Sequence, residues 1–164
     1  MITSDTTKTL ARDKSPQMLA FVRLLRAHAA ITRHLSAQLL GSHGLTLNDY
    51  EVLLHLSLAE ERKLRRVDLA ERVLLTASGI TRLLDGLERA GYVEKGYCTY
   101  DARVTYAILT EPGLEKLREA AQTHIAGVNE LLGENLGETQ LSLLATLLAQ
   151  VPGVDPDAAS CSPE

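Results

Sequence analysis

The segment Thr76–Gly91, TASGITRLLDGLERAG, sets the strictest requirements on how this chain can fold. Thr76 suits the N-cap position of a helix, and Gly91 suits the left-handed residue that follows a helix C-terminus. Four apolar residues between them have the spacing i, i+3, i+4 and i+7: Ile80, Leu83, Leu84 and Leu87. This spacing predicts an amphipathic helix with one buried stripe.

The opposite face of this predicted helix is polar. At 100° per residue it presents Ser78, Arg82, Asp85 and Arg89, with Thr81 at its edge. Short and hydroxyl side chains on the first turns let a helix backbone approach DNA, and an arginine one turn further can bind guanine. The face is therefore typical of a helix that enters the major groove, although an ordinary surface helix would have a similar pattern.

The charge of the chain is unevenly distributed. The net charge is −4, but the stretch Arg62–Arg103 has nine Lys and Arg against six Asp and Glu, and the remainder has eight against fifteen. A locally basic middle in an acidic protein favours binding of a phosphate backbone by one face. Aromatic residues are only 4% of the chain and tryptophan is absent, so we expect a core packed mainly from helices.

The residues before Thr76 predict three helices. The first runs from Pro16 to about Leu40, and its near-heptad seam consists of Met18, Val22, Leu25, Ala29, Thr32 and Leu39. Thr46 and Asp49 form a capping-box pattern that opens the second helix. A charged turn over Glu60–Arg66 leads to a short third helix at about Arg66–Val73. This short helix and the Thr76 helix, joined by a tight turn, predict a helix-turn-helix.

The pattern changes period after Gly91. Two β-branched and aromatic runs, Tyr92–Lys95 and Val104–Leu109, flank the polar stretch Gly96–Arg103 and predict a β-hairpin. A hairpin that follows a recognition helix forms the wing of a winged helix. Two further helices are predicted, one capped by Thr110 with apolar residues from Leu114 to Leu132, and one over Glu138–Val151 with Leu141, Leu144, Leu147 and Leu148 on one side.

The expected fold is mainly α with a small β-hairpin wing: a winged helix-turn-helix flanked by N- and C-terminal dimerisation helices. The first helix and the last two carry more apolar surface than a winged helix of about 65 residues can cover, which favours a homodimer. We therefore predict a disordered segment 1–15, a dimerisation helix 16–44, a DNA-binding domain 45–110, dimerisation helices 111–151 and a disordered tail 152–164.

The run Val67–Gly113 resembles the multiple antibiotic resistance regulator (MarR) family of winged-helix transcription factors. The similar pieces are Leu69-Ala70, Ser78–Leu83, Leu87-Glu88, Gly91–Glu94, Asp101–Arg103, and Leu109-Thr110 with Gly113. With the helix order and the Gly44–Thr46 opening, the likeness extends over about residues 18–150. The resemblance implies a homodimer that binds double-stranded DNA at a pseudo-palindromic operator. It also implies, as in many members, release by a small phenolic or aromatic-carboxylate effector.

The resemblance also suggests which residues contact DNA. Five match the groove-facing part of the family's recognition helix: Thr76, Ser78, Gly79, Thr81 and Arg82. Asp101 and Arg103 match its wing-tip acid and arginine, and an arginine on a hairpin tip is suited to the narrow minor groove. This chain has Ala102 where a second arginine is frequent, so one wing contact is expected to be missing.

An effector pocket is expected where the first and second helices meet the winged domain. Arg26 and His28 would pair with a carboxylate, and Tyr50 and His55 would line an aromatic ring. A zinc-responsive regulator of the same fold is the alternative, with His43 and His124 as ligands. No His-x₃-His pair supports it, and isolated surface histidines explain both residues more simply.

Other function classes find little support. No nucleophile with its base, pair of carboxylates or phosphate-binding glycine loop has a recognisable spacing, so we expect neither an enzyme nor a cofactor. Cys98 and Cys161 lack ligand-like spacing and indicate free thiols in a reducing compartment. No segment has the apolar length of a signal peptide or membrane span, which favours a cytoplasmic protein. A winged-helix protein-interaction module that does not bind DNA stays open.

Overall fold

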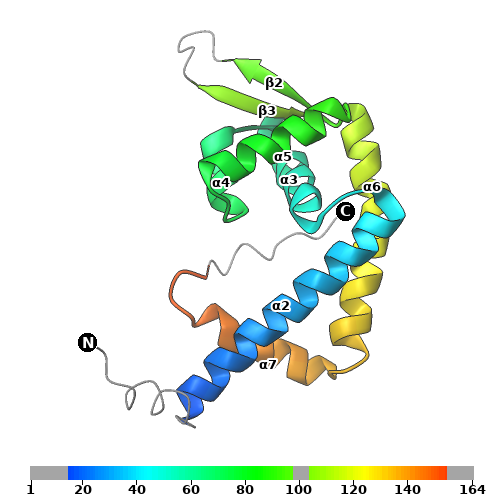
Figure 1. Ribbon diagram of the computed structural model, residues 1–164. Coiled ribbons are helices and arrows are strands. Elements are labelled where there is room, and N and C mark those ends of the chain that lie inside the picture. The colour runs from blue at the N-terminus through cyan, green and yellow to red at the C-terminus, as the bar shows by residue number, and fades with distance from the viewer. Residues whose placement is uncertain (1–14, 98–103, 155–164) are drawn as a thin grey trace, which may run out of the picture.

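The computed structural model describes residues 15–97 and 104–154, which form a winged helix at one end and long helices at the other (Figure 1). The elements in order are α2 (Pro16–His43), α3 (Leu47–Leu58), the 3₁₀ turn η1 (Glu60–Arg62), β1 (Lys63–Arg65), α4 (Arg66–Arg72), α5 (Ala77–Arg89), β2 (Val93–Tyr97), β3 (Thr105–Leu109), α6 (Glu111–Val128), the π-helical turn η2 (Asn129–Gly133) and α7 (Glu138–Ala149). The predicted fold class is confirmed.

The helix α2 is three residues longer than predicted. Ser15 caps its start by accepting a hydrogen bond from the Met18 N–H at 3.3 Å. The helix continues through Gly41 and ends where Gly44 adopts a left-handed φ of 70°, with the Gly44 N–H donating to the Leu40 carbonyl at 3.0 Å. The sequence places the end near Leu40, at the run Gly41–Gly44; Gly41 continues the helix because a glycine inside a helix only weakens it, whereas the left-handed Gly44 ends it.

The helix α3 begins with the predicted capping box. The Thr46 hydroxyl accepts from the Asp49 N–H at 3.2 Å, and the Asp49 carboxylate accepts from the Thr46 N–H at 2.8 Å. Both donors would otherwise be unsatisfied at the helix start. This cap fixes the direction in which α3 enters the winged helix.

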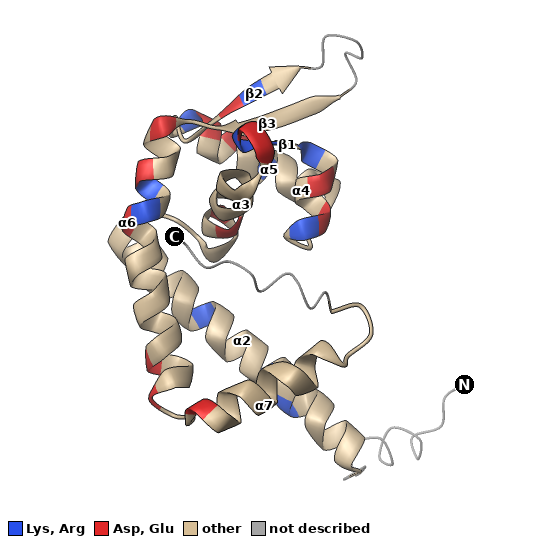
Figure 2. Cartoon of the chain, turned by 180° about the vertical axis from the view of Figure 1, so that it is seen from behind, with Lys and Arg blue, Asp and Glu red and all other residues tan. Residues whose placement is uncertain are grey.

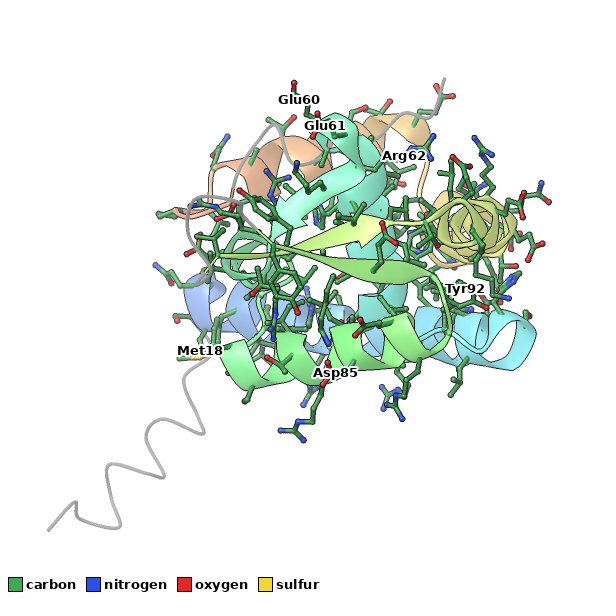
Figure 3. All side chains as sticks on the ribbon, turned by 90° about the horizontal axis from the view of Figure 1, so that it is seen from above. Met18, Glu60, Glu61, Arg62, Asp85 and Tyr92 are labelled. Carbon is green, nitrogen blue, oxygen red and sulfur yellow. The ribbon has the colours of Figure 1, made fainter. Side chains whose placement is uncertain are left out.

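The sheet has three strands, because the predicted charged turn contains β1. In the order β1-β3-β2, both pairs are antiparallel; Leu64 lies opposite Ala107, and Val93 opposite Leu109. Figure 3 shows Glu60, Glu61 and Arg62 together at the turn that follows α3, across the strands from α5. The sheet therefore joins the end of α3 to the wing.

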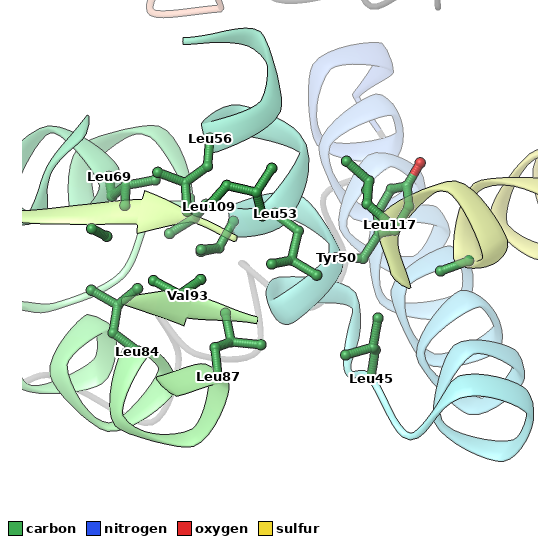
Figure 4. Close-up of a cluster of buried hydrophobic side chains, with 14 of the residues drawn as sticks. Leu45, Tyr50, Leu53, Leu56, Leu69, Leu84, Leu87, Val93, Leu109 and Leu117 are labelled. Carbon is green, nitrogen blue, oxygen red and sulfur yellow. The ribbon is translucent and has the colours of Figure 1, made fainter. Parts of the chain in front are cut away.

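The core fills the space between α3, α4, α5, the sheet and the start of α6 (Figure 4). Its largest fully buried side chains are Leu39 of α2 and Val52, Leu53, Leu56 and Leu69. Val93 and Leu109 reach it from the sheet, and Leu117 from α6. The helix α5 is therefore fixed to the same core as β2 and β3.

The C-terminal helices leave much apolar surface uncovered. The helix predicted to run to Leu132 changes to a π-helical turn after Val128, and α7 ends at Ala149 rather than Val151. No residue of α7 is buried, so its leucines find no core within one chain. Figure 2 shows that α7 is uncharged except at its start.

Most of the two predicted disordered ends lies outside the described residues. Ser15 is an exception, as the cap of α2, and residues 152–154 form a turn. In the described ranges, no helix has the length and apolarity needed to cross a membrane.

Candidate nucleic-acid interface

The helix α5 is held at both ends by the predicted caps. The Thr76 hydroxyl accepts from the Gly79 N–H at 3.1 Å. Gly91 has a φ of 78°, its N–H donates to the Glu88 carbonyl at 2.9 Å, and the Tyr92 N–H donates to the Leu87 carbonyl at 3.0 Å. This pair of bonds is a Schellman motif. With its Ile80, Leu84 and Leu87 stripe buried, α5 presents a fixed polar face.

The outward face of α5 matches the sequence interpretation. Ser78, Arg82 and Arg89 are exposed and Asp85 is half-buried. The Arg89 Nε donates to the Asp85 carbonyl at 3.0 Å, which ties this side chain to its own helix. In the part of the chain that the structure describes, Arg82 forms no hydrogen bond or ion pair.

The two threonines of the predicted site are already engaged. The Thr76 hydroxyl accepts the capping bond and lies 3.2 Å from the Ser78 hydroxyl. The Thr81 hydroxyl donates to the Ala77 carbonyl at 2.7 Å and accepts from Nη2 of Arg66. The predicted site therefore divides into Ser78 and Arg82, which face outward, and two threonines whose hydroxyls hold the helix.

The wing is joined to α5 through Lys95 of β2. Its Nζ lies 2.6 Å from the Glu88 carboxylate and 3.4 Å from that of Asp85. These hydrogen bonds raise the pKa of Lys95, so it stays charged. A lysine held by two carboxylates of α5 orients β2 and the recognition helix relative to one another. The predicted wing-tip residues Asp101 and Arg103 lie outside the described residues.

A mainly apolar cavity of about 430 Å³ lies between α3 and α6. The Tyr50 and His124 rings stack within it, with centroids 4.5 Å apart and planes at 27°. Burial lowers the pKa of His124, and its Nδ1 is buried without a hydrogen-bond partner in the described structure. Arg118 lines the cavity and is exposed, so it supplies a positive charge beside the two rings.

The four predicted effector residues do not converge within one chain. Tyr50 lines the cavity, whereas Arg26 and His28 are exposed on α2. His55 is half-buried, and both burial and the nearby Arg72 lower its pKa. Because Arg72 belongs to α4, His55 lies near α4. Sequence reasoning missed Arg118 as a lining residue and considered His124 only as a zinc ligand.

The histidines of the zinc alternative have other partners. The His43 Nε2 lies 2.7 Å from the Thr123 hydroxyl, and His124 stacks on Tyr50. Within residues 15–97 and 104–154, no group of three or more His, Cys, Asp or Glu residues is placed to hold a metal ion.

Comparison with known proteins gives a consistent result. The family model described as MarR family matches residues 43–103. AbsC, a MarR family transcriptional regulator from Streptomyces coelicolor, is 32% identical with a TM-score of 0.74, over 84% of this chain and 93% of AbsC. Sco3205, a second such regulator from that organism, was solved in complex with DNA; it is 29% identical with a TM-score of 0.74, over 79% of this chain and 81% of its own.

A curated relative agrees with these structures. The HTH-type transcriptional regulator MhqR of Bacillus subtilis is 28% identical over 131 residues, which are 80% of this chain and 88% of MhqR. The matched segment 43–103 contains α3 to β2, the elements that carry and support the polar face of α5. The 32% identity to AbsC extends over 84% of this chain, and the family model matches within the same region. This chain therefore belongs to the MarR family.

Proposed function

We propose that this chain is a cytoplasmic, homodimeric regulator that binds a pseudo-palindromic operator and represses transcription. The exposed guanidinium of Arg82, which has no hydrogen-bond or ion-pair partner among residues 15–97 and 104–154, on a helix capped at both ends is the observation that carries this proposal. The DNA complex of Sco3205 supports it by similarity. Occupation of an operator within a promoter would exclude polymerase, which accounts for repression.

The N-terminal half of α5 would enter the major groove. Gly79, without a side chain, permits close approach, while Ser78 and Arg82 reach phosphates and base edges. Thr76 and Thr81 border the same surface, and we assign Asp101 and Arg103 to the minor groove on the predicted hairpin tip. Two copies of α5 about one DNA turn apart would read the two halves of the operator.

The exposed apolar side chains of the terminal helices support the homodimer. They include Leu19, Phe21, Leu24 and Leu25 on α2 and Leu143, Leu144 and Leu147 on α7. Soluble monomers seldom expose so many large apolar side chains on neighbouring helices. Pairing α2 and α7 with their copies in a second chain would cover it.

The cavity between α3 and α6 suits a small aromatic acid. Its apolar lining and the Tyr50 ring would accept the ring of the ligand, and Arg118 would pair with a carboxylate. The exposed Arg26, named from sequence, lies on α2 and does not line this cavity. We therefore assign the carboxylate to Arg118. A ligand between α3 and α6 would change the spacing of the two reading helices and release the DNA.

The DNA-binding proposal is tested by footprinting on DNA next to the gene. Arg82→Ala should weaken operator binding by about 1–3 kcal/mol and relax preference at one base pair per half-site. Arg33→Ala, which changes an exposed arginine of α2, should leave operator binding unchanged. A wild-type protein that binds no DNA at low salt would instead support the protein-interaction module.

The effector proposal is tested by titrating the protein–operator complex with salicylate, phenol and zinc. Salicylate should release the DNA at lower concentration than phenol, and Arg118→Gln should remove this difference. Arg26→Gln is the matched control and should respond as the wild type does. Release by zinc alone would support a metal-responsive regulator, and release by none of the three would overturn the effector proposal.

A further inference from the structure

The first residue of α4 reaches across the helix-turn-helix to the recognition helix. Nη2 of Arg66 donates a hydrogen bond to the Thr81 hydroxyl, which in turn donates to the Ala77 carbonyl at 2.7 Å. The hydroxyl has thereby used its proton and one of its two lone pairs. Arg66 is thus connected, through one side chain, to the first turns of α5.

The guanidinium of Arg66 lies where α4, α5 and the sheet meet. It lines a cavity of about 490 Å³ together with α5 and the start of β3, and it also lines a narrow crevice between α5 and the wing. The residues around it include Ala77, Ile80, Leu84, Lys95, Thr105 and Tyr106. Its Nε is buried without a hydrogen-bond partner in the described structure. A half-buried guanidinium in this place fills space that three elements share.

The neighbouring Arg65 has a different arrangement. Its Nε and Nη2 donate to the two carboxylate oxygens of Asp68 at 2.8 and 2.9 Å. This bidentate pair keeps Arg65 within its own helical turn and exposed to solvent. The two adjacent arginines therefore have different partners: Arg66 donates a hydrogen bond to the recognition helix, whereas Arg65 pairs with Asp68 of α4.

We infer that Arg66 is a positioning residue for operator discrimination, acting through the Thr81 hydroxyl. This inference rests on the proposed function and adds to it a residue on the supporting helix. Arg82 follows Thr81 directly, so the Arg66–Thr81 bond fixes the part of α5 from which Arg82 extends. A bidentate contact to guanine tolerates little displacement. Loss of this bond should therefore reduce operator recognition more than it reduces attraction to phosphate.

The measurement is the ratio of operator affinity to affinity for unrelated DNA, with its salt dependence, on full-length protein. Arg66→Ala and Thr81→Val should each lower the ratio about tenfold, as expected for one lost base contact. The double variant should be no worse than either single variant, because both remove the same bond. Arg66→Gln and Thr81→Ser retain a donor and a hydroxyl and should restore most of the ratio.

Arg65→Ala is the matched control and should leave the ratio unchanged. Three results would overturn the inference: an unchanged ratio in Arg66→Ala and Thr81→Val, additive losses in the double variant, or equal weakening for all DNA with a shallower salt slope. The last result would make Arg66 a phosphate contact. If Arg66→Ala does not fold, the comparison of Thr81→Val with Thr81→Ser still tests the inference, because only the first variant removes the hydroxyl. A wild-type protein that binds no DNA would refute the proposed function instead.

Discussion

Leu74, in the turn between α4 and α5, has a backbone conformation that suits glycine. Its φ is 54° and its side chain is 92% exposed. A left-handed conformation costs a residue with a Cβ about 1–2 kcal/mol, and the exposed leucine gains nothing from burial. Leu74→Gly should therefore raise the free energy of unfolding by about 0.5–1 kcal/mol, after the entropy cost of glycine is included. Denaturant unfolding measures this change.

The control for this prediction is Gly44→Ala, the opposite exchange at a comparable φ. Gly44 has a φ of 70°, and a Cβ built there meets nothing within 4 Å. Gly44→Ala should therefore lower the free energy of unfolding by about 1 kcal/mol, and this decrease would reflect the backbone conformation alone. A stabilised Gly44→Ala or a destabilised Leu74→Gly would contradict the argument.

His124 makes stability depend on pH in a predictable direction. Burial lowers its pKa in the folded chain below the usual 6.5, so the unfolded chain binds more protons in the interval between the two values. The stability from the neutral ring is complete above pH 6.5 and falls as the pH drops toward the lowered value. We expect less loss of unfolding free energy between pH 7.5 and 5.5 in His124→Gln than in the wild type.

His55 changes stability with pH in the same direction as His124, because burial and Arg72 lower its pKa. Its contribution to stability is also lost as the pH falls below 6.5. The double variant His55→Gln/His124→Gln should have a flatter pH profile than either single variant. A His124→Gln profile as steep as the wild-type profile would exclude the histidine as its source.

At the scale of elements, α2 and α6 approach closely at Gly127. A Cβ on this residue would meet the Gln38 Oε1 and, at 2.8 Å, the Leu35 Cδ2. Leu35 is buried and cannot move aside without disturbing the core. Gly127→Ala should therefore cost about 1–3 kcal/mol of unfolding free energy, measured with denaturant.

Gly86 is the matched helical glycine. An added Cβ there meets nothing within 4 Å, so Gly86→Ala should stabilise α5 by about 0.5–1 kcal/mol. Equal effects of the two substitutions would show that helix propensity, and not the contact with α2, determines the cost at Gly127.

The caps and most helices were predictable because their signals are local. Thr46 with Asp49 and Thr76 with Gly79 form hydrogen bonds within one turn, and Gly91 provides the left-handed residue. The strand β1 was not predictable, because Lys63-Leu64-Arg65 has one apolar residue and becomes a strand only by pairing with β3. The Arg66–Thr81 bond and the Tyr50–His124 stack join residues far apart in sequence, so no local pattern shows them.

At the scale of the whole molecule, the terminal helices should determine the assembly. Leu25 of α2 and Leu147 of α7 are each 52% exposed in the single chain. A charge at either position would be buried without a partner in the proposed dimer, at high cost. The wild type should sediment as the proposed dimer at micromolar concentration, whereas Leu25→Asp and Leu147→Asp should sediment as monomers of 17.9 kDa.

Leu58 of α3 is the control, because it is 56% exposed and belongs to the winged helix. Leu58→Asp should remain dimeric. Dissociation by all three substitutions would indicate a general loss of folding, and dissociation by none would place the dimer contacts elsewhere.

The absence of buried residues in α7 has a consequence for how much active regulator a cell contains. In the proposed dimer, the leucines of this helix leave water only when two chains meet, so association and the stability of the C-terminal region depend on the same event. Well below the dissociation constant, mass action makes the dimer concentration vary with the square of the chain concentration. Halving synthesis would then leave one quarter of the DNA-binding species, and the response of an operator to gene dosage would be steeper than linear.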